Sequence, residues 1–402
     1  MIVDSIPVID VDSHVSEPPE LWLDRLPRKW HDIAPRIVNT DTKAGDLWVV
    51  GDHTLSPAWG FAPAGHTEPW PSFPRVQSEV DPAAYDPNVR AKRLDEFGIR
   101  AQLLYPNLLG LWIRTFLQVG DRDFQLACFR AYNDFISDFA AAEPGRFVPI
   151  ASVPFFDIDA SIAEVERCAA NGHKGILLAN QPEKAGLPPL NDEYWRPLLS
   201  LAEDAGLSVN FHVGFGQVGK EAHESTDAEL KVNTFISGGI ADVLPAAIGR
   251  TVIAIFLSNA GAIADVILSG VCEQYPKLNI VSVESGFGYV PWLLEALDWQ
   301  WVNYGAQDAN PERLLPSEYF RRQIYATFWF EGEVMRRLID LYPDNLMFET
   351  DYPHPTCIAP GPTSHTVTAA ELIEENLAGI PEDIVRKVLS GTAARLYDLS
   401  TG

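Results

Sequence analysis

Short apolar runs recur along the chain, and segments with helical periodicity fill the intervals between them. Asp86-Pro87 predicts a helix start and Gly98 its end, while Asp159 predicts another start with Gly172 as its stop. Eight apolar runs alternating with helices are typical of an α/β fold, the (β/α)8 TIM barrel, which we therefore predict. The predicted strands span residues 6–12, 101–105, 147–154, 174–179, 207–213, 278–284, 323–329 and 346–351.

Two intervals are longer than ordinary connections of a barrel. Residues 40–85 are rich in proline, glycine and tryptophan, with a hairpin expected at Gly51-Asp52, and we predict a lid that covers the C-terminal face of the barrel. Residues 215–277 predict a largely helical insertion after the fifth strand. No linker or repeat is visible, so residues 1–402 are expected to form a single domain.

The composition is that of a folded protein with a large core, and the net charge argues against some kinds of partner. Hydrophobic residues make up 47% of the 402 residues, enough for a large core. The net charge of −25 argues against nucleic acid and anionic membranes as partners, and the longest apolar stretch, around 251–264, is too short to span a bilayer. The four cysteines lack CxxC spacing, which predicts reduced core residues. No signal peptide is visible, so a cytoplasmic location is expected.

Residue types that bind metals stand where predicted strands end. Asp12 and His14 follow the first apolar run, and His212, Glu284 and Asp351 follow three later ones. Because the C-terminal ends of barrel strands converge on one site, we predict a shared metal centre. Each residue alone is a weak signal: His212 also fits a core histidine, and Glu284 could pair with a cation or with an arginine.

Neighbouring residues have open interpretations. Asp10 lies deeper than the predicted ligands and fits a hydrogen-bonded structural carboxylate. Glu17 fits a ligand or a helix cap, and Glu349 fits a ligand or a residue just outside the ligands. His354 could donate a proton, orient the substrate or close its loop, and Arg114 could hold a substrate carboxylate.

Several motifs resemble the amidohydrolase superfamily, in the amidohydrolase-related branch that includes aminocarboxymuconate-semialdehyde decarboxylase. They are the segments 10–14 (DVDSH), 210–214 (NFHVG), 284–288 (ESGFG), 348–354 (FETDYPH) and 393–398 (AARLYD). The resemblance spans the chain and implies the barrel fold. It is specific to the branch and does not specify a reaction.

By position, the resemblance implies that Asp12, His14, His212 and Asp351 hold the metal. In hydrolytic members the strand-8 aspartate accepts a proton from metal-bound water, whereas in decarboxylating members the ion binds the substrate carboxylate. This chain departs from the family with Asp12 in place of a histidine or glutamate, and with Glu284 in place of a histidine. The resulting carboxylate-rich set suits one or two divalent ions, Fe or Mn, with Zn also considered.

The leading hypothesis is a metal-dependent hydrolase or carboxy-lyase that acts on a small, apolar or aromatic molecule, with Asp351 and His354 as catalytic residues. One alternative is a nonheme dinuclear Fe or Fe/Mn monooxygenase, which a carboxylate-rich site also fits. Another is a noncatalytic barrel subunit. We expect a homo-oligomer or an assembly with a related barrel subunit.

Overall fold

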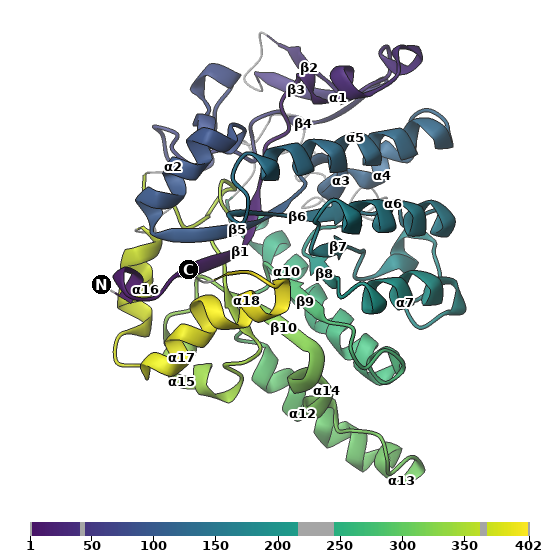
Figure 1. The fold of residues 1–402 in the computed structure, drawn as a ribbon, viewed down its shortest axis with the longest axis vertical. Helices are drawn as coiled ribbons and strands as arrows, with labels where there is room; N and C mark the ends of the chain where they lie inside the picture. Colours follow the sequence, from purple (N-terminus) through teal and green to yellow (C-terminus); the bar gives the residue numbers. More distant parts are fainter. Residues whose placement is uncertain (1, 41–44, 216–244, 362–367, 401–402) are drawn as a thin grey trace.

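The computed structural model describes residues 2–40, 45–215, 245–361 and 368–400, and Figure 1 shows its strands enclosed by helices. Eight parallel strands form one sheet, and each strand coincides with a predicted apolar run. The (β/α)8 barrel predicted from the sequence is therefore confirmed. In order around the sheet, the strands are β1 (Val8–His14), β5 (Ile99–Tyr105), β6 (Phe147–Ser152), β7 (Gly175–Leu177), β8 (Ser208–His212), β9 (Ile280–Val283), β10 (Ile324–Phe328) and β11 (Leu346–Phe348).

The barrel closes where the first strand meets the chain that follows the last strand. Ser13 and Tyr352 form a parallel bridge, and the His14 N–H donates to the Tyr352 carbonyl at 2.7 Å. The Asp351 N–H donates to the Asp12 carbonyl at 3.0 Å. The seam between the two ends of the sheet therefore runs through three of the predicted ligands.

The helices between the strands begin and end close to the predicted signals, with one correction. Asp86 caps α2 (Pro87–Phe97) by accepting the Asn88 N–H, and Gly98 ends it at φ 72°. The cap of α6 (Ile158–Ala170) is Asp157, which accepts the Ala160 N–H at 3.0 Å, so the prediction of Asp159 was wrong. Asp159 lies in the first turn instead, where a carboxylate also favours the helix dipole.

The remaining α-helices are α1 (Glu20–Arg25), α3 (Leu108–Leu111), α4 (Ile113–Phe116), α5 (Arg122–Ala141), α7 (Arg196–Asp204), α10 (Pro245–Leu268), α11 (Val271–Gln274), α12 (Val290–Asn303), α13 (Ala306–Ala309), α14 (Pro316–Gln323), α15 (Glu333–Leu338), α16 (Ala369–Leu377), α17 (Glu382–Arg386) and α18 (Thr392–Tyr397). The motif at 393–398 thus lies largely on α18.

The segment 40–85 carries two strands of a small antiparallel sheet. This sheet consists of β2 (Arg36–Asn39), β3 (Asp46–Val50) and β4 (His53–Pro57), and the turn at Gly51-Asp52 joins β3 to β4 as predicted. The segment touches the loop after β11, because the Ala64 N–H donates to the Pro353 carbonyl at 3.3 Å. Its role as a lid over the barrel stays a prediction.

The predicted insertion 215–277 is helical over α10 and α11, and its part at 216–244 lies outside the described residues. Buried hydrophobic side chains form one continuous core through the barrel and its helices. All four cysteines are free and buried, as predicted. Among the described helices, none combines the length and apolar character needed to cross a membrane.

Candidate metal centre

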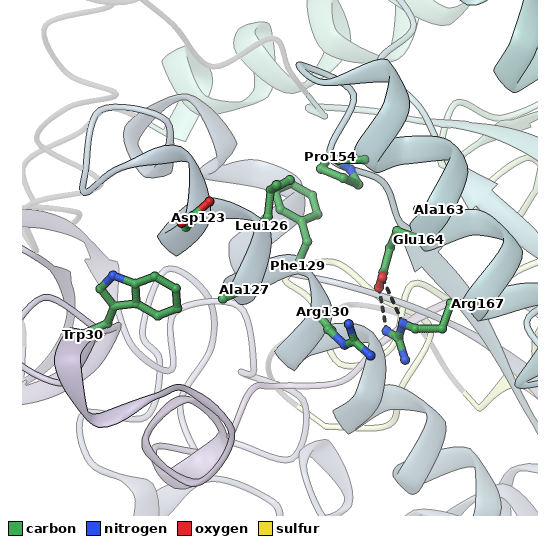
Figure 2. A pocket seen from close by; sticks show the side chains of 11 residues that line it. Trp30, Asp123, Leu126, Ala127, Phe129, Arg130, Pro154, Ala163, Glu164 and Arg167 are labelled. Atoms are coloured by element: carbon green, nitrogen blue, oxygen red, sulfur yellow. Dashed lines mark hydrogen bonds and ion pairs between the residues drawn. The ribbon is translucent and has the colours of Figure 1, made fainter.

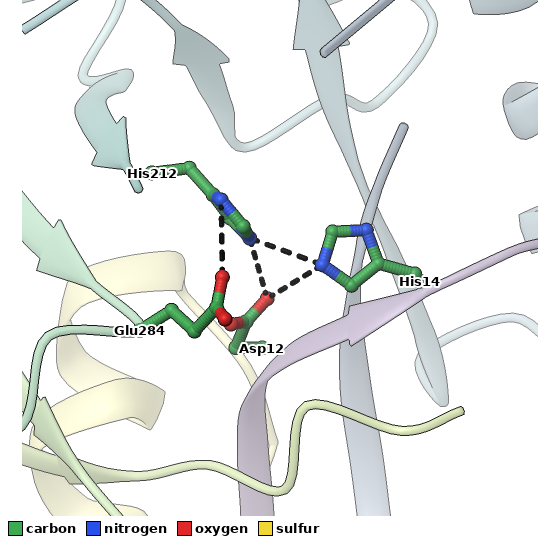
Figure 3. A group of neighbouring side chains, drawn as sticks. All are labelled: Asp12, His14, His212 and Glu284. Atoms are coloured by element: carbon green, nitrogen blue, oxygen red, sulfur yellow. Dashed lines mark hydrogen bonds and ion pairs between the residues drawn. The ribbon is translucent and has the colours of Figure 1, made fainter. Parts of the chain in front are cut away.

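Four predicted ligands from three strand ends lie together at the C-terminal end of the barrel, and Figure 3 shows their side chains turned toward one another. His212 Nε2 lies 3.3 Å from Asp12 Oδ1 and 3.0 Å from His14 Nε2. Glu284 Oε2 lies 3.5 Å from His212 Nδ1. The sequence therefore located a cluster whose members are separated by more than two hundred positions.

The fifth predicted ligand, Asp351, joins this cluster through His14. Asp351 Oδ1 lies 3.6 Å from His14 Nε2 and 3.0 Å from His354 Nδ1. The rings of His14 and His354 are stacked, with centroids 3.7 Å apart. All five predicted ligands and His354 thus border one site, while their individual roles as ligands stay predictions.

The donor set fits a divalent cation. Asp12 is fully buried, and neither of its carboxylate oxygens accepts a hydrogen bond. A buried carboxylate without a partner is costly, and buried charges are normally paired or bound to metals. Within the described part of the chain, the basic groups paired with Asp12 are the imidazoles of His14 and His212. Carboxylates and imidazoles around one point are a set that first-row divalent ions accept.

The acidic side chains carry the electrostatic signature of a crowded anionic site. Burial, together with the charges of Glu284 and Asp12, raises the pKa of Asp351 well above its usual value. Burial and Asp12 also raise the pKa of Glu349 strongly. Burial alone would lower the pKa of His212, but Asp12 and Glu284 outweigh it and raise that pKa to about 9. A bound cation would relieve the repulsion among these carboxylates.

Two of the predicted ligands have left-handed backbone conformations. Glu284 has φ 59° just after β9, and Asp351 has φ 58° three residues after β11. This region is uncommon for residues other than glycine, and such strain collects at functional sites. The two carboxylates therefore project from sharp turns at strand ends, and not from the strands that the sequence predicted to reach them.

His354 has a defined proton arrangement. The Asn107 amide nitrogen donates to the Val15 carbonyl at 3.3 Å, which turns Asn107 Oδ1 toward His354 Nε2 at 2.7 Å. Because that oxygen can only accept, the proton of a neutral His354 is assigned to Nε2. Nδ1 then faces Asp351 as an acceptor, and burial lowers the pKa of His354 well below its usual value. His354 is thus fixed on one side by Asn107 and faces Asp351 on the other.

Two neighbouring carboxylates have structural partners. Asp10 accepts hydrogen bonds from the Thr350 hydroxyl at 2.5 Å and from Gln102 Nε2 at 2.6 Å, which confirms its interpretation as a structural carboxylate. Glu17 accepts the backbone N–H groups of Asn107 and Leu108 at 3.0 and 2.9 Å. This contact at the start of α3 favours the capping interpretation of Glu17 over the ligand interpretation.

The structure leaves the predicted roles of Glu349 and Arg114 open. Glu349 is fully buried and accepts the Glu284 N–H at 3.2 Å, so it lies beside the ligands and contacts the backbone of one of them. Arg114 lies on α4, but its side chain is outside the described part of the structure, and its predicted role in substrate binding stays a prediction.

Sequence reasoning missed two residues at this site, Asn107 and Phe61. Asn107 follows the predicted second strand closely, so its position was the available signal. Phe61 comes from the segment 40–85, and its ring lies 5.4 Å from that of His354. No local pattern identifies Phe61, because this contact depends on how the segment folds back over the barrel.

Two cavities differ in their relation to the site. A small one beside Asn107 is lined by Trp48, Phe61, Leu108 and Trp112, among others. A larger one, of about 430 Å³, lies on the outside of the barrel between α5 and α6 (Figure 2), and its lining includes Trp30 and Arg130. None of the five predicted metal ligands lines either cavity, but the small one is lined by Asn107 and Phe61, which both contact His354.

Comparison with known proteins places the chain in a family. The sequence profile of the family described as Amidohydrolase matches residues 64–399. The chain is 23% identical over 307 residues to 2-amino-3-carboxymuconate-6-semialdehyde decarboxylase of Dictyostelium discoideum, a match that covers 75% of this chain and 76% of that protein.

Solved structures share the fold. An amidohydrolase from Mycobacterium avium subsp. paratuberculosis K-10 superimposes with a TM-score of 0.72 and 20% identity, covering 98% of this chain and 99% of the other. A dihydroxybenzoic acid decarboxylase from Polaromonas sp. JS666, solved with manganese and the inhibitor 2-nitroresorcinol, has a TM-score of 0.61 and 18% identity, covering 98% and 97%. The chain therefore belongs to the amidohydrolase superfamily, in the branch that includes aminocarboxymuconate-semialdehyde decarboxylase, and is a metal-dependent enzyme of the hydrolase or decarboxylase type.

Proposed function

We propose that this enzyme is a carboxy-lyase that removes the carboxylate of a small aromatic acid, using a divalent ion at the strand ends. The observation that carries the proposal is the buried cluster of Asp12, His14, His212, Glu284 and Asp351, in which the basic groups that face Asp12 within the described residues are two imidazoles. Such a cluster is suited to hold a cation that in turn binds an anionic substrate.

The relatives support decarboxylation over the other chemistries considered. The Dictyostelium and Polaromonas proteins are both named as decarboxylases, and the second is a decarboxylase of an aromatic acid with manganese bound. Neither is named as an oxygenase, so the monooxygenase alternative has no support from these comparisons. We therefore propose manganese as the first ion to test.

The ion would be held by Asp12, His14 and His212, with Glu284 and Asp351 as the further predicted ligands. When bound, it supplies positive charge that anchors the substrate carboxylate and an adjacent oxygen. The carboxylates of this chain would hold that charge at the C-terminal end of the barrel, and the hydrogen bond that His354 Nε2 donates to Asn107 Oδ1 holds His354 in a fixed orientation.

Asp351 is the proposed acid. Loss of carbon dioxide breaks the bond between the ring and the carboxyl carbon, and a proton must replace it on the ring carbon. Asp351 Oδ1 lies 3.0 Å from His354 Nδ1, and His354 is in turn oriented by Asn107. In this proposal Asp351 takes up a proton from solvent, passes it to the ring carbon as the carboxyl group leaves, and is protonated again by solvent after the product departs.

An aromatic substrate fits the surroundings. Phe61 lies beside His354, and Trp112 lies near Phe61 with ring centroids 6.5 Å apart. These rings, with Trp48 and Leu108, line the cavity that adjoins Asn107. That cavity has a volume of only about 10 Å³, so the proposal of a planar ring that carries a carboxylate rests on the aromatic side chains beside His354 and not on the cavity.

The test is a metal-reconstituted assay. The purified protein is stripped of metal, loaded separately with Mn²⁺, Zn²⁺, Co²⁺ or Fe²⁺, and given a panel of hydroxylated benzoates, with carbon dioxide release measured. We expect release with at least one ion, and loss of at least about a hundredfold in rate in Asp351→Asn, the scale typical of a lost general acid.

Two results would contradict the proposal. Hydrolysis of ester or amide substrates without carbon dioxide release would identify a hydrolase. Iron-dependent oxygen consumption with hydroxylated product would restore the monooxygenase alternative. Because each chemistry yields a different product, the benzoate panel, a set of esters and amides, and oxygen-uptake measurements on the same metal-loaded protein together separate all three.

A further inference from the structure

Asn259 on α10 joins the ends of three barrel strands and takes no part in the mechanism described above. Its side chain is fully buried. Its amide nitrogen lies 2.8 Å from the Phe211 carbonyl oxygen, 3.2 Å from the Val283 carbonyl oxygen and 2.7 Å from Ser285 Oγ. Phe211 directly precedes His212, and Val283 directly precedes Glu284. Asn259 is thus bonded to the peptide groups that carry two of the proposed ligands.

The orientation of the Asn259 amide is determined by a fourth contact. Asn180, which follows β7, donates through Nδ2 to Asn259 Oδ1 at 2.6 Å. The oxygen of Asn259 therefore faces a donor and its nitrogen faces acceptors, so the amide has one satisfactory orientation. The residue connects α10 with the ends of β7, β8 and β9 at the same time.

We infer that Asn259 is a positioning residue, which sets the directions of His212 and Glu284 toward the ion; this inference rests on the metal-binding role proposed for those two residues. A hydrogen bond to the carbonyl at 211 or 283 restricts rotation of the peptide plane that leads into the ligand. The restriction matters most at Glu284, whose backbone has the left-handed φ of 59°. Such a conformation persists only where the surrounding structure holds it.

Asn345 offers a matched control elsewhere in the barrel. It is also buried, and its amide nitrogen donates to the carbonyls of Phe320 at 3.1 Å, Arg321 at 3.2 Å and Ile324 at 2.8 Å. Asn345 precedes β11 and therefore lies at the opposite end of the strands from the ligands. Its loss should disturb folding as the loss of Asn259 does, but without a connection to the site.

The experiment compares Asn259→Leu with Asn345→Leu, which remove equivalent amides and keep similar volume. Metal-free protein is titrated with Co²⁺ alone, and both the affinity and the visible absorption of the bound ion are measured. Thermal unfolding of the metal-free proteins is measured alongside. We expect both variants to unfold at lower temperature, and only Asn259→Leu to bind Co²⁺ at least about tenfold more weakly, with an altered spectrum, as for other residues that orient ligands.

Equal Co²⁺ affinity and identical spectra in wild type and Asn259→Leu would overturn the inference, as would equal weakening in the two variants. If Asn259→Leu does not fold, Asn259→Ser, which keeps a shorter polar side chain, is tested against Asn345→Ser with the same expectation. A wild type that binds no divalent ion would instead refute the proposed function, so the two failures are distinguishable.

Discussion

At the scale of single residues, the question is whether Glu284 is a metal ligand or a structural carboxylate. The sequence left a cation and an arginine open as its partner. In the described chain, the basic side chain that pairs with Glu284 is His212, and no arginine does so. We predict that Glu284→Gln lowers metal affinity more than the roughly 100-fold seen when a residue that merely orients a ligand is lost. The metal-free protein should keep or gain stability, because like charges are relieved.

Glu331 provides the control for that substitution. It is a buried carboxylate in the same region that accepts the backbone N–H groups of Phe287, Gly288 and Trp329. Glu331→Gln should destabilise the protein and leave the metal content unchanged. Metal per chain and metal-free melting, measured for both variants, separate the two roles. Retained metal and a large stability loss in Glu284→Gln would identify Glu284 as a scaffold residue.

His173 makes stability depend on pH at a point remote from the ligands. Burial, aided by the positive charge of Arg167, lowers the pKa of His173 to about 4. The unfolded chain takes up a proton below its ordinary pKa of about 6.5, whereas the folded protein does not until about 4, so stability is lost as the pH falls through this window. Between pH 7.5 and 5 the loss attributable to His173 should be about 2 kcal/mol.

Denaturant unfolding of the metal-free protein at pH 7.5 and 5 measures this loss. His173→Gln, which keeps a polar group opposite the Ser137 hydroxyl at the same depth, is the control and should lose about 2 kcal/mol less than the wild type over the same interval. An identical pH dependence in the two proteins would mean that His173 does not titrate as described.

That the predicted ligands lie close together could be foreseen from the sequence, because each stands at or near the end of an apolar run and parallel strands of a barrel end on one face. Asn259 could not be predicted, since its role arises from contacts between α10 and two strand ends. The same holds for Phe61, whose contact with His354 requires a fold of the segment 40–85. Local sequence patterns predict the position of a residue within its own helix or strand, but not its contacts with other elements.

At the scale of secondary-structure elements, the seam between β1 and β11 depends on Asp10. Thr350, after β11, donates to the Asp10 carboxylate through both its hydroxyl at 2.5 Å and its N–H at 2.9 Å. We predict that Thr350→Val, which removes the hydroxyl that donates to Asp10 and accepts the Tyr352 N–H at 3.2 Å, lowers the free energy of unfolding by about 2 kcal/mol, the scale of buried polar groups that lose a partner.

The matched substitution is Thr392→Val on α18. The Thr392 hydroxyl is buried and donates to the neutral carbonyl of Pro343 at 3.2 Å. Removal of this hydroxyl should lower the free energy of unfolding by about 1 kcal/mol or less. Equal losses in the two variants, determined by denaturant unfolding, would show that the Asp10 bond contributes no more than an ordinary one.

The sequence predicted the elements better than their ends. All eight strands follow from apolar runs, because strands buried on both faces are nearly continuous in hydrophobic residues. The last strand, β11, nevertheless stops at Phe348, before the polar residues that lead to Asp351. The start of α6 was misassigned by two residues, since two aspartates compete for the cap and only the backbone geometry chooses between them.

At the scale of the whole molecule, the outer face of α12 has an unusual composition. Trp292 and Trp299 are 71% and 67% exposed. They stand seven positions apart, about two helical turns, and so share a face. Large exposed aromatic groups on one face are typical of protein interfaces. The oligomer expected from the sequence stays a prediction, and we place its contact on this face.

Light scattering after gel filtration tests that assignment. We expect wild type at a multiple of 44.5 kDa, and the double variant Trp292→Glu/Trp299→Glu at the monomer mass. Leu341→Glu, at another exposed apolar side chain, should keep the wild-type mass. A wild-type monomer would remove the prediction, and an unchanged double variant would place the contact elsewhere.

The closure of the barrel by Asp351 and Asp12 has a consequence for how the protein is made. One predicted ligand belongs to the first strand and another follows the last, and their backbones are bonded to each other. During synthesis, residue 12 leaves the ribosome long before residue 351, so this seam forms only after both ends of the barrel have been made. If Asp351 binds the ion as proposed, the five predicted ligands come together only at that late stage.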